Sequence, residues 1–299
     1  MKVLISGASG LIGTELQKQL IVQGHTPLLL VRRPAKNSTE IEWNPIKHEL
    51  DSKQLESIDA VVNLAGATTG KLPWTKKYKS ELISSRLDST KTIVEAIAKT
   101  KNKPKVLVSG SASGFYGDQK DGLLTESSPK GSGFLSDLSA QWEQEALKAT
   151  GNTRVVLVRT TLVFSRKLGA LGRLLPLIRL GVAGSLGSGK QWWAFISLPD
   201  EARAIIHLIN TPTAHGVYNL TAPEAATCKQ IINGLGKQMH RPTLIPIPGF
   251  ALKLAFREGA SELLLCSQKM SAEKLLATGF VFEHPTLKSA CQWVCSKSE

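Results

Sequence analysis

Residues 2–16 read KVLISGASGLIGTEL, an apolar run that stops at three glycines and then continues in a helical pattern. Gly7, Gly10 and Gly13 permit a tight bend, close approach of a pyrophosphate to the backbone, and close packing of a helix on a strand. The start of that helix offers unpaired N–H groups and a positive dipole end to the phosphate. The turn therefore predicts a dinucleotide site. The alternative is an ordinary glycine-rich loop between a strand and a helix.

The end of the second predicted strand bears on which dinucleotide is bound. In NAD-binding domains this position, about 20 residues after the glycines, usually carries an acid for the ribose 2′-hydroxyl. Here residues 28–36 read LLLVRRPAK, so Arg32 and Arg33 stand where that acid would be. Two guanidinium groups suit a 2′-phosphate and leave no carboxylate to select NAD. We therefore predict NADP(H) as the cofactor, with a plain basic loop as the alternative.

Short β-branched runs alternate with longer helical patterns along the first half of the chain. Strands are predicted over residues 2–6, 27–32, 59–64, 105–109 and 154–160, and helices over 11–23, 81–100 and 134–149. Strands that are apolar almost throughout are typical of a parallel sheet covered on both faces. Repeated β-α alternation predicts right-handed crossovers and an α/β fold with a doubly wound parallel sheet.

The composition changes after residue 165. A segment rich in Gly, Leu and Arg spans 169–190, and a helix near 200–210 and a strand near 216–220 follow it. The tail beyond residue 222 carries five prolines between short helical patterns. We predict a Rossmann domain over residues 1–165, to which 195–221 return, and a smaller substrate lobe. The ranges assigned to that C-terminal lobe are 166–194 and 222–299.

The net charge of +13 raises the question of a nucleic-acid partner. Residues 71–105 hold ten Lys and Arg against Glu81, Asp88 and Glu95, with few aromatic residues between them to stack on bases. A solvated basic face is the simpler interpretation, and we expect no nucleic acid as a partner. No apolar run reaches the roughly 18 residues that span a bilayer, so we expect no membrane partner either.

Cysteine and histidine usage argues against a metal site. The four cysteines all lie in the last quarter of the chain without a CxxC pair, and the six histidines show no ligand spacing. We predict buried thiols in a reducing compartment and no bound metal. The N-terminal apolar run is broken by Ser6, Gly7 and Ser9, which is unlike a signal peptide. A cytoplasmic location is therefore expected.

Several motifs together resemble the extended short-chain dehydrogenase/reductase (SDR) superfamily. They are the glycine spacing of the first turn, NLAG at 63–66 and SGSASGFYG at 109–117. Further motifs resemble one atypical branch, the "epimerase family" proteins described as predicted nucleoside-diphosphate-sugar epimerases with a characteristic C-terminal domain. These are EWNP at 42–45, the run from Pro73 to Arg86, GSGKQWW at 187–193, NLTAPE at 219–224 and RPTLIPIPGFALKLAF at 241–256. The resemblance extends over essentially the whole chain.

This resemblance implies a set of cofactor contacts. They are expected from Gly7, Ser9, Gly10, Leu11, Ile12, Gly13, Arg32, Arg33, Leu64, Ala65, Gly66, Glu81, Arg86 and Leu162. Arg86 has the length and charge to reach a phosphate, and Glu81 to bind a ribose hydroxyl. A surface pair on one helix is the alternative for these last two residues.

The resemblance also directs attention to catalytic groups. Reductases of the superfamily use a Tyr as proton donor or acceptor, and a Lys four residues later lowers its pKa. Here Leu135 and Ser139 stand at those positions, and neither side chain titrates near neutral pH. Ser111 matches the serine that holds the substrate oxygen, with Ser113 as the fallback. Tyr116 is then the best remaining proton donor.

Two functions remain open at this point. The first is an NADP(H)-dependent oxidoreductase or epimerase-like enzyme, acting as a monomer or homodimer on a small carbonyl- or hydroxyl-bearing substrate. That substrate would lie between Ser111, Tyr116 and the lobe near Trp192 and Trp193. The second, suggested by descriptions of some relatives, is a non-catalytic NADP(H)-binding sensor or a cell-division-related interaction protein.

Overall fold

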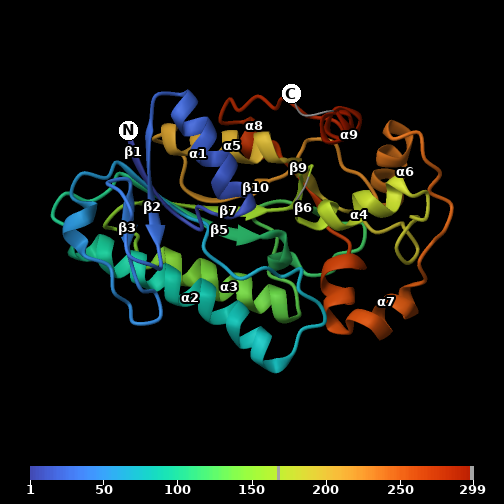
Figure 1. Ribbon diagram of the computed structural model, residues 1–299, viewed down its shortest axis with the longest axis horizontal. Coiled ribbons are helices and arrows are strands. Elements are labelled where there is room, and N and C mark those ends of the chain that lie inside the picture. Colours follow the sequence, from blue (N-terminus) through green and yellow to red (C-terminus); the bar gives the residue numbers. More distant parts are fainter. Residues whose placement is uncertain (167–168, 297–299) are drawn as a thin grey trace.

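The computed structural model describes residues 1–166 and 169–296, and a parallel sheet of seven strands runs through its centre (Figure 1). The strand order is β3-β2-β1-β4-β5-β7-β10. The strands are β1 (Lys2–Ser6), β2 (Thr26–Val31), β3 (Glu40–Glu42), β4 (Ala60–Asn63), β5 (Val106–Ala112), β7 (Arg154–Thr160) and β10 (Gly216–Leu220). After β1 the chain first builds one side of the sheet and then crosses to the other at β4. Ligands of open α/β sheets bind at the carboxyl ends of strands flanking such a reversal.

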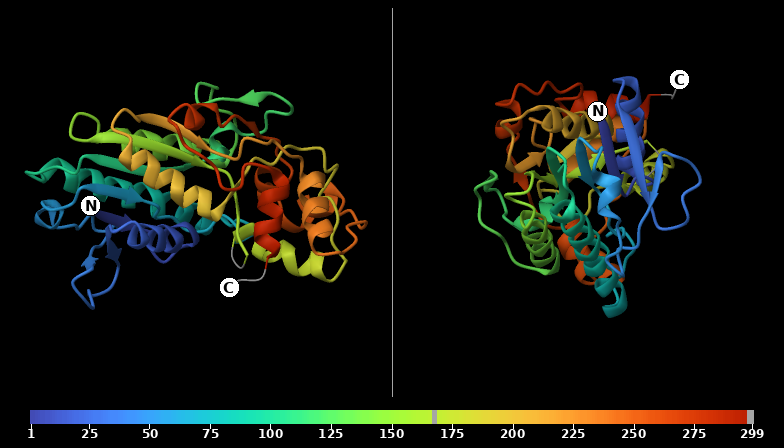
Figure 2. Two further views of the ribbon diagram at one scale, coloured as in Figure 1. Left: turned by 90° about the horizontal axis from the view of Figure 1, so that it is seen from above. Right: turned by 90° about the vertical axis from the view of Figure 1, so that its left-hand side faces the viewer.

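Two helices cover each face of the sheet, which confirms the predicted doubly wound α/β fold (Figure 1; Figure 2). Helices α1 (Leu11–Val22) and α5 (Leu198–Asn210) lie on one face, and α2 (Lys76–Lys99) and α3 (Phe134–Leu147) lie on the other. Helix α2 begins five residues earlier than predicted, because the Thr75 hydroxyl accepts a hydrogen bond from the Tyr78 amide and caps the helix there.

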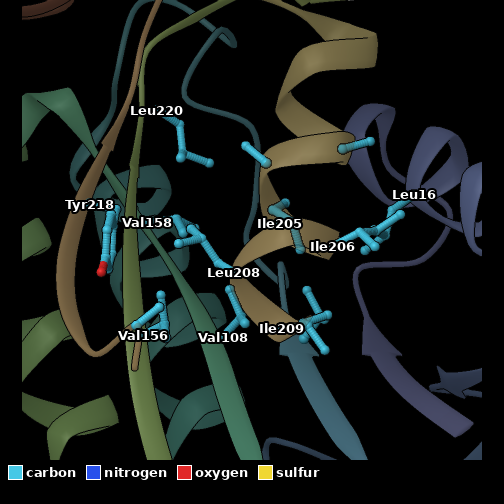
Figure 3. Close-up of a cluster of buried hydrophobic side chains, with 14 of the residues drawn as sticks. Leu16, Val108, Val156, Val158, Ile205, Ile206, Leu208, Ile209, Tyr218 and Leu220 are labelled. Carbon is cyan, nitrogen blue, oxygen red and sulfur yellow. The ribbon is translucent and has the colours of Figure 1, made fainter. Parts of the chain in front are cut away.

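The face under α1 and α5 holds the larger part of the core (Figure 3). Leu16 of α1 and Ile205 and Ile206 of α5 pack in one cluster with the strand side chains, among them Val108 and Val158 (Figure 3). Each of these side chains is almost wholly buried. Burial of one such aliphatic side chain contributes roughly 1.5–3 kcal/mol, so this face accounts for much of the stability of the sheet.

The opposite face is closed by α2 and α3. Ile93 and Ile97 of α2 and Ala146 of α3 pack against Leu107 and Leu157 of the sheet. Because both faces are covered in this way, the strands read as the unbroken apolar runs seen in the sequence. The short strand β3 was not predicted, since three residues are too few for a strand pattern to show.

The C-terminal lobe has its own apolar cluster. Helices α4 (Gly169–Arg179), α6 (Cys228–Gln238) and α9 (Leu287–Cys295) surround it. The smaller elements of the whole structure are β6 (Leu123–Leu124), β8 (Leu162–Phe164), β9 (Phe195–Ser197), β11 (Lys269–Met270), α7 (Gly249–Phe256), α8 (Glu273–Leu276), the 3-10 helices η1 (Ser52–Leu55) and η2 (Ser113–Tyr116), and the π-helix η3 (Ala260–Leu264). Of these, β11, α7, α8 and η3 lie within the ranges predicted for the lobe. Part of the tail returns to the sheet, where Phe280 and Phe282 join the core under α5.

The four cysteines are free thiols, and three of them are buried. Burial raises the pKa of the Cys266 and Cys291 thiols to about 12, so both stay protonated and unreactive at neutral pH. No helix in the described part of the chain combines the length and the apolar character needed to cross a bilayer.

Candidate dinucleotide site

The glycine turn after β1 is as tight as its sequence predicts. Gly7 has φ +68°, and a Cβ atom added to it would lie 2.5 Å from the Leu64 carbonyl oxygen. A Cβ atom added to Gly13 would lie 2.4 Å from the Gly7 carbonyl oxygen. Neither position accommodates a side chain, because backbone atoms already fill that space. The glycines therefore bring α1 directly against the ends of β1 and β4.

The start of α1 is left open towards solvent. Gly10 is the N-cap residue and supplies no side-chain cap, and the first turn carries no acid. Within the described residues, the amides of Leu11, Ile12 and Gly13 have no hydrogen-bond acceptor. Ser9 and Gly10 are exposed beside them. Free amides at the positive end of a helix dipole suit a phosphate group, so this cradle fits the pyrophosphate of a dinucleotide.

The two arginines after β2 have different surroundings. Arg33 donates two hydrogen bonds to the Glu40 carboxylate, at 2.7 and 2.6 Å. Arg33 in turn lowers the pKa of Glu40 to about 2, so the carboxylate stays charged. Arg32 is exposed and forms no ion pair with any residue in the described ranges. Arg32 is thus the freer cation, whereas Glu40 orients Arg33 and partly neutralises its charge.

The carboxyl end of β4 is held by a buried polar network that the sequence alone did not indicate. Ser6 donates a hydrogen bond to Asn63 Oδ1 at 2.6 Å, and Asn63 Nδ2 donates to Thr90 Oγ1 at 2.8 Å. Trp142 Nε1 donates to the same Thr90 oxygen at 2.9 Å. This network joins β1, β4, α2 and α3. The Ala65 amide also donates to Asn63 Oδ1 at 3.4 Å, so the network reaches the start of the segment 64–66, where cofactor contacts are predicted.

Arg86 lies near this part of the site and has no carboxylate partner within residues 1–166 and 169–296. Its guanidinium donates to the carbonyl oxygens of Leu82 and Ala67, each at 3.0 Å, and its centre lies 5.2 Å from the Trp142 ring. Burial lowers the pKa of Arg86 to about 10, which still leaves it charged at neutral pH. Glu81 is exposed, and the structure shows no ion pair between it and Arg86 in the described part of the chain. A half-buried cation whose described partners are two carbonyl groups and an aromatic ring is suited to an anionic ligand.

Ser111 lies at the end of β5 and is tied to a buried ion pair. Its hydroxyl donates to Glu143 Oε1 at 2.6 Å, and Arg159 donates to both oxygens of the same carboxylate at 2.8 and 2.9 Å. Although burial acts to lower it, the bonds to Glu143 raise the pKa of Arg159 above its usual value. The proton of Ser111 is therefore committed to Glu143, and its oxygen remains as a hydrogen-bond acceptor.

Tyr116 does not occupy the position expected of a proton donor. Its side chain has no exposed surface, and its hydroxyl lies 2.7 Å from Asn219 Oδ1 and 3.0 Å from the Thr125 carbonyl oxygen. Burial raises the pKa of this phenol above its usual value. A buried hydroxyl with two acceptors inside the protein is poorly placed for proton transfer to a substrate, so the catalytic role of Tyr116 stays a prediction that this geometry does not favour. Tyr116 instead links the loop after β5 to β10.

The place of the missing Tyr-Lys pair is filled by apolar packing. Leu135 lies in a cluster with Trp74, Tyr78 and Leu138, and Ser139 is buried on the next turn of α3. Glu262 of the lobe accepts hydrogen bonds from the amides of Phe134 and Leu135 at 2.8 and 2.7 Å. The lobe therefore closes the start of α3 with a carboxylate of its own, a contact that no sequence pattern indicated.

The remaining predicted residues lie where the lobe meets the sheet. Leu162 begins β8 and is half-buried, with its amide donating to the Ala194 carbonyl oxygen at 3.1 Å. Trp192 Nε1 donates to Asp121 at 2.9 Å, and Trp193 Nε1 donates to the Leu264 carbonyl oxygen at 3.2 Å. The Trp192 indole thus ties the lobe to the loop after β5, and the Trp193 indole forms its hydrogen bond within the lobe.

Comparison with known proteins agrees with this architecture. Residues 3–221 match the model of the NAD dependent epimerase/dehydratase family, and residues 247–294 match a domain of unknown function, DUF1731. An epimerase family protein of Mycobacterium tuberculosis is 38% identical over 99% of this chain and 98% of its own length.

Solved structures give the same picture. The crystal structure of human epimerase family protein SDR39U1 with NADPH has a TM-score of 0.92 and 32% identity, and covers 99% of each chain. A nucleoside-diphosphate sugar epimerase from Corynebacterium glutamicum has a TM-score of 0.79 and 27% identity over 97% of this chain and 57% of its own. The resemblance drawn from the sequence motifs is confirmed, and the chain belongs to the NAD dependent epimerase/dehydratase family.

Proposed function

We propose that this chain binds NADP(H), with the pyrophosphate at the open start of α1 and the 2′-phosphate beside Arg32 and Arg33. The observation that carries the proposal is the cradle itself, in which Gly7 and Gly13 leave no room for a Cβ atom and the first amides of α1 have no acceptor among the described residues. The exposed Arg32 guanidinium adds a cation where NAD-selecting domains carry an acid. The NADPH in the human relative supports the same choice.

We further propose that the bound cofactor serves an oxidoreductase or epimerase-like reaction on a small carbonyl- or hydroxyl-bearing substrate. Bound NADP(H) would supply or accept a hydride. Ser111 is the remaining group for the substrate oxygen, because it lies at the carboxyl end of β5. Since its own proton points to Glu143, Ser111 accepts a hydrogen bond from a substrate hydroxyl more readily than it donates one to a carbonyl. This favours an alcohol as the bound partner.

A second candidate function rests on a different observation. The hydroxyls of both Ser111 and Tyr116 are bonded inside the protein, and Leu135 and Ser139 replace the usual acid-base pair. A protein with this interior would bind NADP(H) tightly without turnover and act as a sensor or interaction module. Binding of the cofactor would then change how the protein interacts with a protein partner.

One experiment separates the two functions. The purified protein, with NADPH bound, is offered a panel of aldehydes, ketones and quinones, and with NADP⁺ a panel of alcohols, while absorbance of NADPH is followed. We expect turnover that Ser111→Ala lowers by at least about tenfold, the cost of one lost hydrogen bond to the reacting oxygen. Tyr116→Phe is the matched control, and we expect it to keep turnover in the fraction that folds.

Other outcomes of this experiment decide against the enzyme. Tight NADPH binding without turnover on any compound would decide against the proposed reaction and favour the second function. Turnover that survives Ser111→Ala but is abolished by Tyr116→Phe would contradict the roles that the hydrogen bonds assign to these two residues.

The free state of all four thiols supports our further proposal of a reducing, cytoplasmic location.

A further inference from the structure

Helix α7 is apolar but exposed. It reads GFALKLAF, and Leu252 is its one buried side chain. Phe250 is 76% exposed and Leu254 is 83% exposed, and their spacing of four residues puts them on the same side of the helix. A surface helix of a soluble domain normally turns its apolar side to the core. The outward side of α7 is therefore a candidate contact surface.

Neighbouring segments extend this apolar surface. Leu244 and Ile245 in the loop before α7 are 83% and 56% exposed, and Leu180, just after α4, is 74% exposed. The two loops run side by side, because the Ile247 amide donates to the Ser185 carbonyl oxygen at 2.9 Å and the Gly187 amide donates to that of Ile247 at 2.9 Å. We call Leu180, Val182, Leu244, Ile245, Phe250 and Leu254 the α7 surface. It lies at the end of the molecule farthest from β3 (Figure 1).

The two segments that carry the α7 surface are rich in cations. Residues 166–199 contain five Lys and Arg and no Asp or Glu, and the same is true of residues 225–257. The exposed members next to the apolar side chains are Arg179, Lys237, Arg241, Lys253 and Arg257. The structure shows no ion pair for any of them within the described ranges. Their charge is therefore available to a partner.

A hollow beside α7 is lined by both apolar and basic side chains. It has a volume of about 360 Å³, and its lining includes Ser188, Phe250 and Lys253. A second copy of this chain would place like charges against one another across such a contact, which is unfavourable. Exposed apolar side chains near cations that have no ion pair in the described ranges instead match an anionic lipid surface, where the apolar side chains enter the acyl region and the cations lie at the phosphates.

We propose that the α7 surface docks peripherally on anionic membranes. Phe250 and Leu254 insert below the headgroups, and the flanking cations, Arg241 and Lys253 among them, bind lipid phosphates. We expected no membrane partner from the sequence, because no single segment is long enough to span a bilayer. Peripheral docking needs only the juxtaposition of residues 180–182, 244–245 and 250–254, which the fold provides. The proposal is independent of the cofactor and its chemistry.

Vesicle sedimentation tests the proposal with the full chain. The probes are vesicles of phosphatidylcholine alone and of phosphatidylcholine with about 30% phosphatidylserine. We expect the protein to sediment with the anionic vesicles only, and less at high salt. Phe250→Ser/Leu254→Ser and Arg241→Glu/Lys253→Glu should each weaken this binding by at least about tenfold. All four side chains are largely outside the core, so melting temperature and NADPH affinity serve as checks on folding.

Matched variants on other surfaces complete the test. Val22→Ser/Ile46→Ser removes two side chains that are each 80% exposed, and Lys91→Glu/Lys99→Glu reverses two exposed charges on α2. Both should bind vesicles within about twofold of the unchanged protein. The proposal is overturned if the unchanged protein does not sediment, or if the α2 variant loses as much binding as Arg241→Glu/Lys253→Glu. It is also overturned if the unchanged protein is a dimer that Phe250→Ser/Leu254→Ser dissociates, while vesicle binding persists.

Discussion

Arg33 and Glu40 form a two-bond ion pair between the loop after β2 and strand β3, whereas Arg32, one residue earlier, has no acidic partner in the described part of the chain. The carboxylate fixes Arg33 in place but offsets part of its charge. Arg32 keeps its full charge and its freedom to turn towards an anion. The two arginines, which are equivalent in the sequence, are therefore expected to contribute unequally to cofactor binding.

Single substitutions of the two arginines test this difference. Arg32→Ala should weaken NADPH binding by about 10- to 100-fold, the range for losing a charge-assisted hydrogen bond to a phosphate. Arg33→Ala should weaken it less, and NADH affinity should change little in either variant. Fluorescence titration with both cofactors measures all four constants. Unchanged NADPH affinity in Arg32→Glu/Arg33→Glu would show that the 2′-phosphate is bound elsewhere.

Because the glycine turn is so crowded, we expect a single added methyl group to lower the stability of the protein strongly. In Gly13→Ala the new Cβ atom would lie 2.4 Å from the Gly7 carbonyl oxygen, so α1 must move away from the sheet. We expect a loss of at least about 2 kcal/mol in the free energy of unfolding, together with loss of NADPH binding. Gly122→Ala is the matched control, because its new Cβ atom would meet nothing closer than 3.4 Å. Urea denaturation of both variants measures the difference, and equal stabilities would contradict the close packing seen here.

The buried Glu143–Arg159 pair below Ser111 predicts a strongly asymmetric response to mutation. Glu143→Gln leaves the Arg159 charge buried without its counter-ion, which typically costs about 3–5 kcal/mol. Ser111→Ala removes a single neutral donor and should cost only about 1 kcal/mol. Urea denaturation of both variants and of the double variant gives the coupling energy between the two residues. Equal costs for the two single variants would indicate that the pair is solvated rather than buried.

Because Glu201 is buried, we expect the free energy of unfolding to fall as the pH rises. Complete burial raises the pKa of this carboxyl to about 8, and Thr160 donates to Oε1 at 2.6 Å while Oε2 has no partner among the described residues. The folded protein holds the proton more tightly than the unfolded chain does. This stabilisation is complete below pH about 4.5 and is lost as the pH rises to about 8, by at most roughly 5 kcal/mol.

The amide variant isolates this contribution. Glu201→Gln mimics the protonated form and should flatten the pH dependence of the free energy of unfolding between pH 5 and pH 9. Glu42→Gln, at an exposed acid of β3, should retain the unchanged protein's profile. Urea denaturation across that pH range measures both. A Glu201→Gln profile that still falls with the unchanged slope would assign the pH dependence to another group.

The sequence alone determined the fold class and the place of the dinucleotide turn. Both depend on local patterns: unbroken apolar strands, helical periodicity, and glycines at positions where a Cβ atom would meet backbone. Such patterns are encoded within a few neighbouring residues, so they are visible before any folding is known. Each predicted strand of the sheet appears in the structure within three residues of its expected bounds.

The tertiary structure alone decided what each polar side chain does. Glu40 accepts hydrogen bonds from Arg33, Glu143 accepts one from the Ser111 hydroxyl, and Asn219 accepts one from the Tyr116 hydroxyl. Each partner is brought in by a different strand or helix, so residue spacing along the chain carries no signal of the pairing. For the same reason the α7 surface, formed by segments distant in the sequence, emerges only from the folded chain. Hydrogen bonds and charges act over a few ångströms in space, and only the fold determines which residues come that close.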